Sequence, residues 1–167
     1  ELTVTASAPM AGGYDLLATA HTLFQDELYD HPSYPALLVT AYNDVYGWDM
    51  LDQAFRPNYA SRMNTLFSGS YSLEYIDSRL PDSLSSLFTE SFLTSIQDTT
   101  NQEFIGALRE NSLLDWYPSA PIRLYHGDAD ITVPYQNSLT AEASLSARSS
   151  STVELVTIAG GTHVSSA

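Results

Sequence analysis

Two short apolar runs flank an amphipathic stretch near the end of the chain, and this order constrains the fold more than any other feature. The first run, PIRLYH at residues 121–126, begins with a proline and follows another at position 118. The second, VELVTI at residues 153–158, is closed by a pair of glycines, so each run predicts a β-strand. Between them, residues 133–147 carry apolar side chains in helical register. Strand, helix and strand in this order predict a βαβ unit with parallel strands and a right-handed crossover.

The first fourteen residues predict a further strand and a loop. Over Leu2–Ala8 apolar residues alternate with threonine and serine, which is the pattern of a strand with one buried face. Pro9 and the Gly12–Gly13 pair interrupt the alternation and predict the loop. Sheet elements are therefore expected at both ends of the chain.

The middle of the chain has helical patterning. Apolar residues recur at spacings of three and four, and the predicted helices cover residues 15–28, 35–47, 72–80, 84–96 and 101–114. The stretch from Asn58 to Ser72 is predicted to be a loop with room for one helical turn. The expected organisation is therefore a strand and loop at residues 1–14, a helical insert at residues 15–115 and the βαβ unit at residues 116–167.

The charge balance disfavours whole classes of partner. Twenty acidic residues against six basic ones give a formal net charge of −14, so the clustered cations that bind nucleic acid phosphates or anionic membranes are lacking. The chain has no cysteine, which removes thiol nucleophiles, disulfides and thiolate metal sites. Its four histidines never stand four positions apart, as a helical zinc pair requires. We therefore expect no metal, no other cofactor and no nucleic acid partner.

The residues that carry chemistry follow the two predicted strands of the βαβ unit. HGDADITVP, residues 126–134, begins at the end of the first strand, and GGTH, residues 160–163, comes just after the second. In open parallel sheets, catalytic groups gather beyond the carboxyl ends of the strands. We expect Asp130 and His163 to meet there, with the Asp130 carboxylate about 2.6 to 3.2 Å from a ring nitrogen of His163. In such a pair the aspartate orients the imidazole, and the histidine accepts and returns a proton.

These two loops resemble those of the α/β-hydrolases. HGDADITVP is similar to the HGxxDxxVP loop, whose fifth-position aspartate is the triad acid, and GGTH is similar to the loop that presents the triad histidine. The resemblance implies that Asp130 and His163 are catalytic, in the chain order that this fold uses. Together with SAPMAGGYDL, the helical insert and NSLLDWYPSAPIRLYHGDADITVP, the loops resemble capped secreted bacterial esterases and lipases.

The resemblance implies a fold and an activity. The fold is α/β, with the last three parallel strands of an α/β-hydrolase sheet and a helical cap insertion at residues 15–115. The activity is that of a serine carboxylic ester hydrolase of the esterase or lipase kind. Its substrate is a small-molecule ester with an apolar acyl chain, and its setting is secreted or periplasmic.

One motif of the family is missing. The nucleophile of these enzymes lies in G-x-S-x-G, and no serine here has glycine two positions before and two after it. We therefore expect the nucleophile, the oxyanion hole and the first five strands to lie upstream of Glu1, and this chain alone to be inactive. The edge of the Leu2–Ala8 strand then lacks its neighbour, and we expect it to pair with the missing N-terminal half or with another copy of the chain.

Each candidate residue also has a structural interpretation. Asp130 can cap the helix that follows it, and Asp128, two positions earlier, is either a rival for the triad acid or a turn residue. His163 can be an ordinary loop histidine. His126 ends a buried strand and is interpreted as a structural histidine.

The aromatic residues of the insert also have two interpretations. They are first the core of the insert itself, and second the wall of an acyl pocket. The residues in question are Phe24, Tyr42, Tyr46, Phe67, Phe88, Phe92 and Phe104.

Two other functions stay open. A serine peptidase of the prolyl-oligopeptidase type shares the HGxxDxxV loop, and the N-terminal half that distinguishes it from an esterase lies upstream. A stand-alone binding module with vestigial triad residues is the alternative from another class, and it would be a stable monomer.

Overall fold

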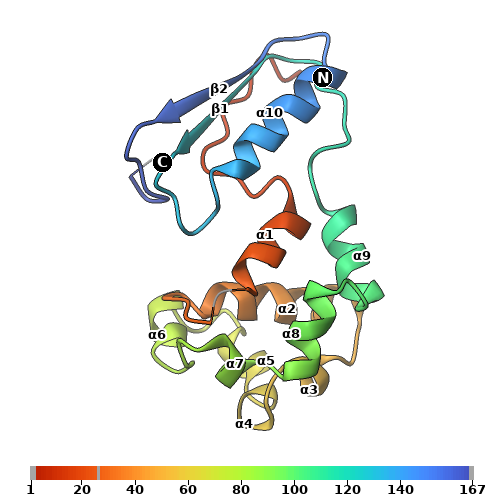
Figure 1. Cartoon of the computed structure of the whole chain (residues 1–167), viewed down its shortest axis with the longest axis vertical. Coiled ribbons are helices and arrows are strands. Elements are labelled where there is room, and N and C mark those ends of the chain that lie inside the picture. Colours follow the sequence, from red (N-terminus) through yellow and green to blue (C-terminus); the bar gives the residue numbers. More distant parts are fainter. Residues whose placement is uncertain (1–2, 26, 166–167) are drawn as a thin grey trace. The chain divides into compact units, whose positions relative to one another are not determined.

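The computed structural model describes residues 3–25 and 27–165, and the chain divides into two compact units. One unit, here named the sheet unit, combines residues 1–19 with residues 109–167. The other, the helical unit, consists of residues 20–108. Figure 1 shows the strands in the former and most of the helices in the latter.

The sheet unit contains β1 (Ile122–Gly127), α10 (Gln136–Arg148) and β2 (Val153–Ile158). The two strands pair in parallel, in a register that places Ile122 beside Val153. α10 crosses between them and lies along one face of the sheet (Figure 1). The predicted βαβ unit is therefore confirmed. The helix begins at Gln136, later than predicted, because the backbone just before it forms turns.

Residues 7–11 run along the other edge of β1, but they do not form the regular strand predicted over Leu2–Ala8. Leu2 lies outside the described residues. In the described part of the segment, pairing with β1 consists of isolated parallel bridges at Ser7 and Met10. The third element of the sheet is therefore shorter, later in the chain and more irregular than the sequence pattern predicts.

Proline at position 9 explains this irregularity. The N–H of Ser7 donates to the carbonyl of Pro121 at 2.9 Å, and the N–H of Ala11 donates to the carbonyl of Tyr125 at 2.8 Å. A regular parallel ladder needs the N–H of the residue midway between Ser7 and Ala11. That residue is Pro9, which has no N–H. The ladder is therefore interrupted at its centre.

Apolar side chains join α10 to the sheet. Ile122 and Leu124 alternate toward the helix, as residues i and i+2 of a strand do. They pack against Ala141 and Leu145 of α10 and against Tyr14, which enters from the N-terminal segment. This cluster is the core of the sheet unit, and it determines which face of β1 meets α10.

The helical unit consists mainly of short helices. Helices α1 (Leu16–Leu23) and α9 (Gln102–Glu110) each contain a boundary between the units. The others are α2 (Ser33–Tyr46), α3 (Leu51–Ala54), α4 (Pro57–Ala60), α5 (Met63–Leu66), α6 (Leu73–Asp77), α7 (Leu84–Leu87) and α8 (Glu90–Gln97). Across the described residues, no helix is both long and apolar enough to span a membrane.

Two predictions for this unit are wrong in detail. The stretch predicted to be a loop from Asn58 to Ser72 contains most of α4 and all of α5. The helix predicted over residues 84–96 is divided in two between Phe88 and Thr89. At the division the Thr89 hydroxyl accepts the N–H of Phe92 as an N-cap, so α8 begins as a separate helix.

An aromatic cluster forms the core of the helical unit, as expected for four of the seven aromatic residues considered. Each of the four rings contacts at least two of the others, with distances of 5.2 to 6.5 Å between ring centroids. All four side chains are buried. They are Phe24, Phe88, Phe92 and Phe104. Tyr42, Tyr46 and Phe67 are only partly buried or exposed.

We expect Leu124→Ala to lower the free energy of unfolding by about 2 to 5 kcal/mol, because Leu124 is fully buried between β1 and α10 and its truncation leaves a cavity. Val45→Ala, at an exposed position of α2, is the control, and its effect is expected to stay within about 0.5 kcal/mol. Urea unfolding followed by circular dichroism measures both. Equal effects of the two substitutions would contradict the assigned core.

Candidate active site

Asp130 lies in the loop between β1 and α10, and its side chain has no contact with solvent. Its Oδ1 accepts the backbone N–H groups of Thr132 and Val133, each at 2.9 Å. The N–H of Asp130 itself donates to the carbonyl of Gly127 at 3.3 Å, so the chain turns back directly after the strand. The loop backbone thus holds Oδ1 and leaves Oδ2 for partners elsewhere.

His163 lies in the loop after β2. Gly160 adopts a φ of 68°, which favours glycine, and the N–H of Gly161 donates to the carbonyl of Ile158 at 3.0 Å. This turn brings Nδ1 of His163 to 2.9 Å from Oδ2 of Asp130, within the expected range. The His163 side chain is 34% exposed. In the described part of the chain, its Nε2 has no hydrogen bond partner.

Asp128 joins the two loops. Its Oδ1 accepts the N–H of Gly160 at 2.7 Å, and its own N–H donates to the carbonyl of Ile158 at 3.3 Å. The N–H of Ala129 donates to the carbonyl of Gly161 at 3.1 Å. The Asp128 carboxylate is therefore engaged with the backbone of the second loop. The structure brings Asp130, and not Asp128, to His163.

His126 contacts the same carboxylate from inside the protein. It is fully buried at the end of β1, and its Nε2 lies 3.1 Å from Oδ2 of Asp130 and 3.0 Å from the carbonyl oxygen of Val133. Its Nδ1 lies 2.6 Å from Oγ of Ser138, on the first turn of α10. The interpretation of His126 as structural left out this contact with Asp130. The spacing in HGDAD, with a strand-end histidine four residues before an acidic turn residue, could have indicated it.

The electrostatics of the site favour an ionised Asp130. Burial raises the pKa of this carboxyl, but the N–H of Val133, the ring and charge of His163 and the N–H of Thr132 outweigh burial. The net pKa therefore lies below the ordinary value of 3.8. Because an ionised carboxylate only accepts hydrogen bonds, Nδ1 of His163 donates its hydrogen to Oδ2. The lone pair of the neutral ring is then on Nε2.

This arrangement can perform general acid–base chemistry. An imidazole whose Nδ1–H is held by a buried carboxylate can accept a proton at Nε2 and return it. Among the described residues, no group of three or more histidine or acidic side chains is arranged to hold a metal ion. Ser68 and Ser70, which flank Gly69 in the helical unit, lie in an exposed loop and bond to each other at 3.2 Å. The described residues thus include an imidazole and the carboxylate that orients it, without a hydroxyl in contact with Nε2 of the imidazole.

The lowered pKa of Asp130 predicts a loss of stability in acid. A carboxyl whose pKa is lower in the folded state stabilises the fold above its ordinary pKa, and this stabilisation is lost as the pH falls through the lower, folded-state pKa. Urea unfolding from pH 7 down to pH 2 should therefore show the stability difference between the wild type and Asp130→Asn shrinking as the pH falls below about 4. A difference that does not change with pH would contradict the lowered pKa.

Comparison with known proteins gives matches only among solved structures. Neither a protein-family model nor a curated protein matches the chain. The esterase LipA from Xanthomonas oryzae, described as degrading the rice cell wall, is 27% identical and has a TM-score of 0.85. The match covers 98% of this chain and 45% of LipA.

Two further structures show the same fold. A Legionella pneumophila protein classed as a hydrolase is 24% identical, with a TM-score of 0.86 over 99% of this chain and 45% of its own. Candida antarctica lipase A in its closed state is 13% identical, with a TM-score of 0.76 over 99% of this chain and 39% of its own. The chain thus spans less than half the length of each of these proteins. It has the fold of the C-terminal portion of an α/β-hydrolase, and it resembles the esterases and lipases of that fold.

Proposed function

We propose that this chain is the C-terminal part of a serine carboxylic ester hydrolase in which Asp130 and His163 are the acid and the base of a Ser-His-Asp triad. The observation that carries the proposal is the 2.9 Å hydrogen bond between Oδ2 of Asp130 and Nδ1 of His163. It forms beyond the carboxyl ends of two adjacent parallel strands. In this proposal the nucleophilic serine and the oxyanion hole belong to a part of the protein that precedes Glu1.

The proposed reaction uses Nε2 of His163, which has no hydrogen bond partner among the described residues. Nε2 takes the proton of the upstream serine hydroxyl as the serine oxygen attacks the ester carbonyl, and the imidazolium returns that proton to the departing alkoxide. Water then attacks the acyl-enzyme with the same assistance. Asp130 keeps the hydrogen on Nδ1 and stabilises the imidazolium through its ionised carboxylate. The partial exposure of His163 supports this role, because Nε2 has to be reachable by serine.

The substrate class and the setting rest on the resemblance to esterases and lipases. We assign residues 15–115 as a cap insertion and small-molecule acyl esters as the substrates. LipA is described as degrading the rice cell wall, which is a target outside the bacterial cell. The same secreted or periplasmic setting is proposed for the protein that contains this chain.

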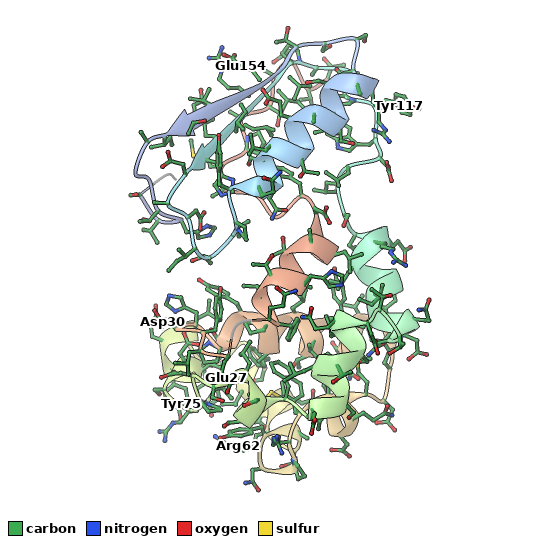
Figure 2. The ribbon with its side chains drawn as sticks, viewed as in Figure 1. Glu27, Asp30, Arg62, Tyr75, Tyr117 and Glu154 are labelled. Carbon is green, nitrogen blue, oxygen red and sulfur yellow. The ribbon has the colours of Figure 1, made fainter. Side chains whose placement is uncertain are left out.

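A missing upstream part would also explain the surface of the sheet unit. Residues 3–8 are exposed, and a groove of about 500 Å³ lies beside Ser7 and Tyr125. The sheet face away from α10 carries Arg123 and Glu154, whose side chains pair at 3.0 Å. Figure 2 labels Glu154, which belongs to β2. In this proposal the upstream part of the protein packs on this groove and pairs with residues 3–8. A second copy of the chain is the other candidate for that edge.

The activity of the full-length protein tests the assignment of His163. We expect it to hydrolyse p-nitrophenyl esters, and we expect His163→Ala to lower kcat by about 10³-fold or more, because the serine loses its base. His31→Ala is the matched control, since His31 also lies near an aspartate, Asp77 at 3.5 Å, but in the helical unit. It should keep the wild-type kcat. The 167-residue chain by itself should release no burst of p-nitrophenol.

Three results would change this assignment. A burst from the isolated chain would place the nucleophile within it. Cleavage of prolyl peptide anilides in preference to esters would favour the peptidase. An unchanged kcat in the His163→Ala variant would refute the triad.

A second pair of variants distinguishes the two aspartates of the loop. Asp130→Asn should lower kcat by about 10⁴-fold with little change in KM, because the neutral amide no longer stabilises the imidazolium or selects the Nδ1–H tautomer. Asp128→Asn should keep most of the activity, because its amide oxygen can still accept the N–H of Gly160. Steady-state kinetics of the full-length protein measures both. The opposite order of effects would make Asp128 the triad acid.

A further inference from the structure

We infer that His126 is a positioning residue for the triad, which holds the same carboxylate oxygen of Asp130 that His163 contacts. The inference rests on the proposed function, because it concerns the same acid–base pair. Oδ2 of Asp130 lies 2.9 Å from Nδ1 of His163 and 3.1 Å from Nε2 of His126. One carboxylate oxygen thus binds two imidazole rings, of which one is fully buried and the other is partly exposed.

The neighbours of His126 determine which of its nitrogens carries hydrogen. Nε2 faces two acceptors, the ionised carboxylate of Asp130 and the carbonyl oxygen of Val133 at 3.0 Å. Neither can donate, so Nε2 carries the hydrogen. Nδ1 of the neutral ring then accepts the hydroxyl hydrogen of Ser138 at 2.6 Å. Ser138 is itself fully buried, so its hydroxyl supplies the hydrogen bond that Nδ1 needs in the tautomer whose Nε2–H donates to Asp130.

The buried ring supplies a restraint that His163 cannot supply. The two backbone N–H groups of Thr132 and Val133 bond only to Oδ1, so Oδ2 depends on other donors. His126 holds Oδ2 from a side chain that is fully buried and that meets the ring of Tyr135 edge to face at 5.7 Å. Donors other than His163 therefore hold both oxygens, which defines the plane of the carboxylate. Such orientation of a catalytic pair matters, because a displacement of about 1 Å can cost about 100-fold in rate.

Substitutions at His126 in the full-length protein test this role. His126→Leu removes the donor to Oδ2, and we expect kcat to fall by about 10- to 100-fold while KM stays near its wild-type value. His126→Gln can place an amide N–H near the position of Nε2, and we expect it to recover most of the lost kcat. Labelling of the serine by a fluorophosphonate provides a second readout, and its rate should follow kcat across the variants. Active-site titration expresses each rate per folded site.

Ser138→Ala provides a test that does not depend on whether His126→Leu folds. It removes one buried oxygen and leaves both rings in place, so we expect a smaller fall in kcat, with KM unchanged. A kcat per folded site that is unchanged in Ser138→Ala and in the His126 variants would overturn the inference and leave the triad standing. A rise in KM without a fall in kcat would also overturn it. A wild-type protein that neither hydrolyses esters nor reacts with the fluorophosphonate would instead refute the proposed function.

Discussion

The buried carboxylate of Asp130 is the group on which the geometry of the candidate site depends. An ionised carboxylate without partners is costly to bury, and here four N–H groups compensate it. Thr132 and Val133 supply two from the backbone, and His126 and His163 supply two from their rings. The turn after β1, the packing of His126 against α10 and the position of the second loop are therefore linked. A change in one of them alters the hydrogen bonding of the same buried charge.

That compensation requires β1 and β2 to be adjacent and parallel. Asp130 and His163 are 33 positions apart in the chain, and their side chains meet at 2.9 Å because each residue follows the carboxyl end of its strand. The strand pairing alone does not hold the two loops together. Asp128 adds a hydrogen bond between its carboxylate and the N–H of Gly160 at 2.7 Å. The two aspartates of HGDAD thus have different contacts. Asp128 joins the two loops, and Asp130 contacts the two histidines.

Sequence patterns correctly predicted the elements whose bounds depend on residues within the segment itself. β1 and β2 lie within one residue of their predicted bounds, because alternation and the flanking proline and glycine residues are encoded in the segments themselves. α2 ends at Tyr46 and is capped by Gly47, whose φ of 68° suits glycine, within one residue of the predicted end. The division at Phe88–Thr89 was not predictable in this way. The Thr89 hydroxyl bonds to the carbonyl of Gln53, and Phe88 bridges to Phe55, so both contacts depend on a segment more than thirty residues away.

The same distinction holds for the candidate site. The sequence by itself determined that Asp130 and His163 would meet, because a βαβ unit places the two loops side by side whatever the details of its packing. Only the tertiary structure decided that His126 shares the carboxylate and that Ser138 bonds to its other ring nitrogen. Those contacts join a strand to the first turn of α10, and they depend on the angle at which the helix packs and on side-chain rotamers. No periodicity within either segment encodes that angle, which the core between β1 and α10 sets.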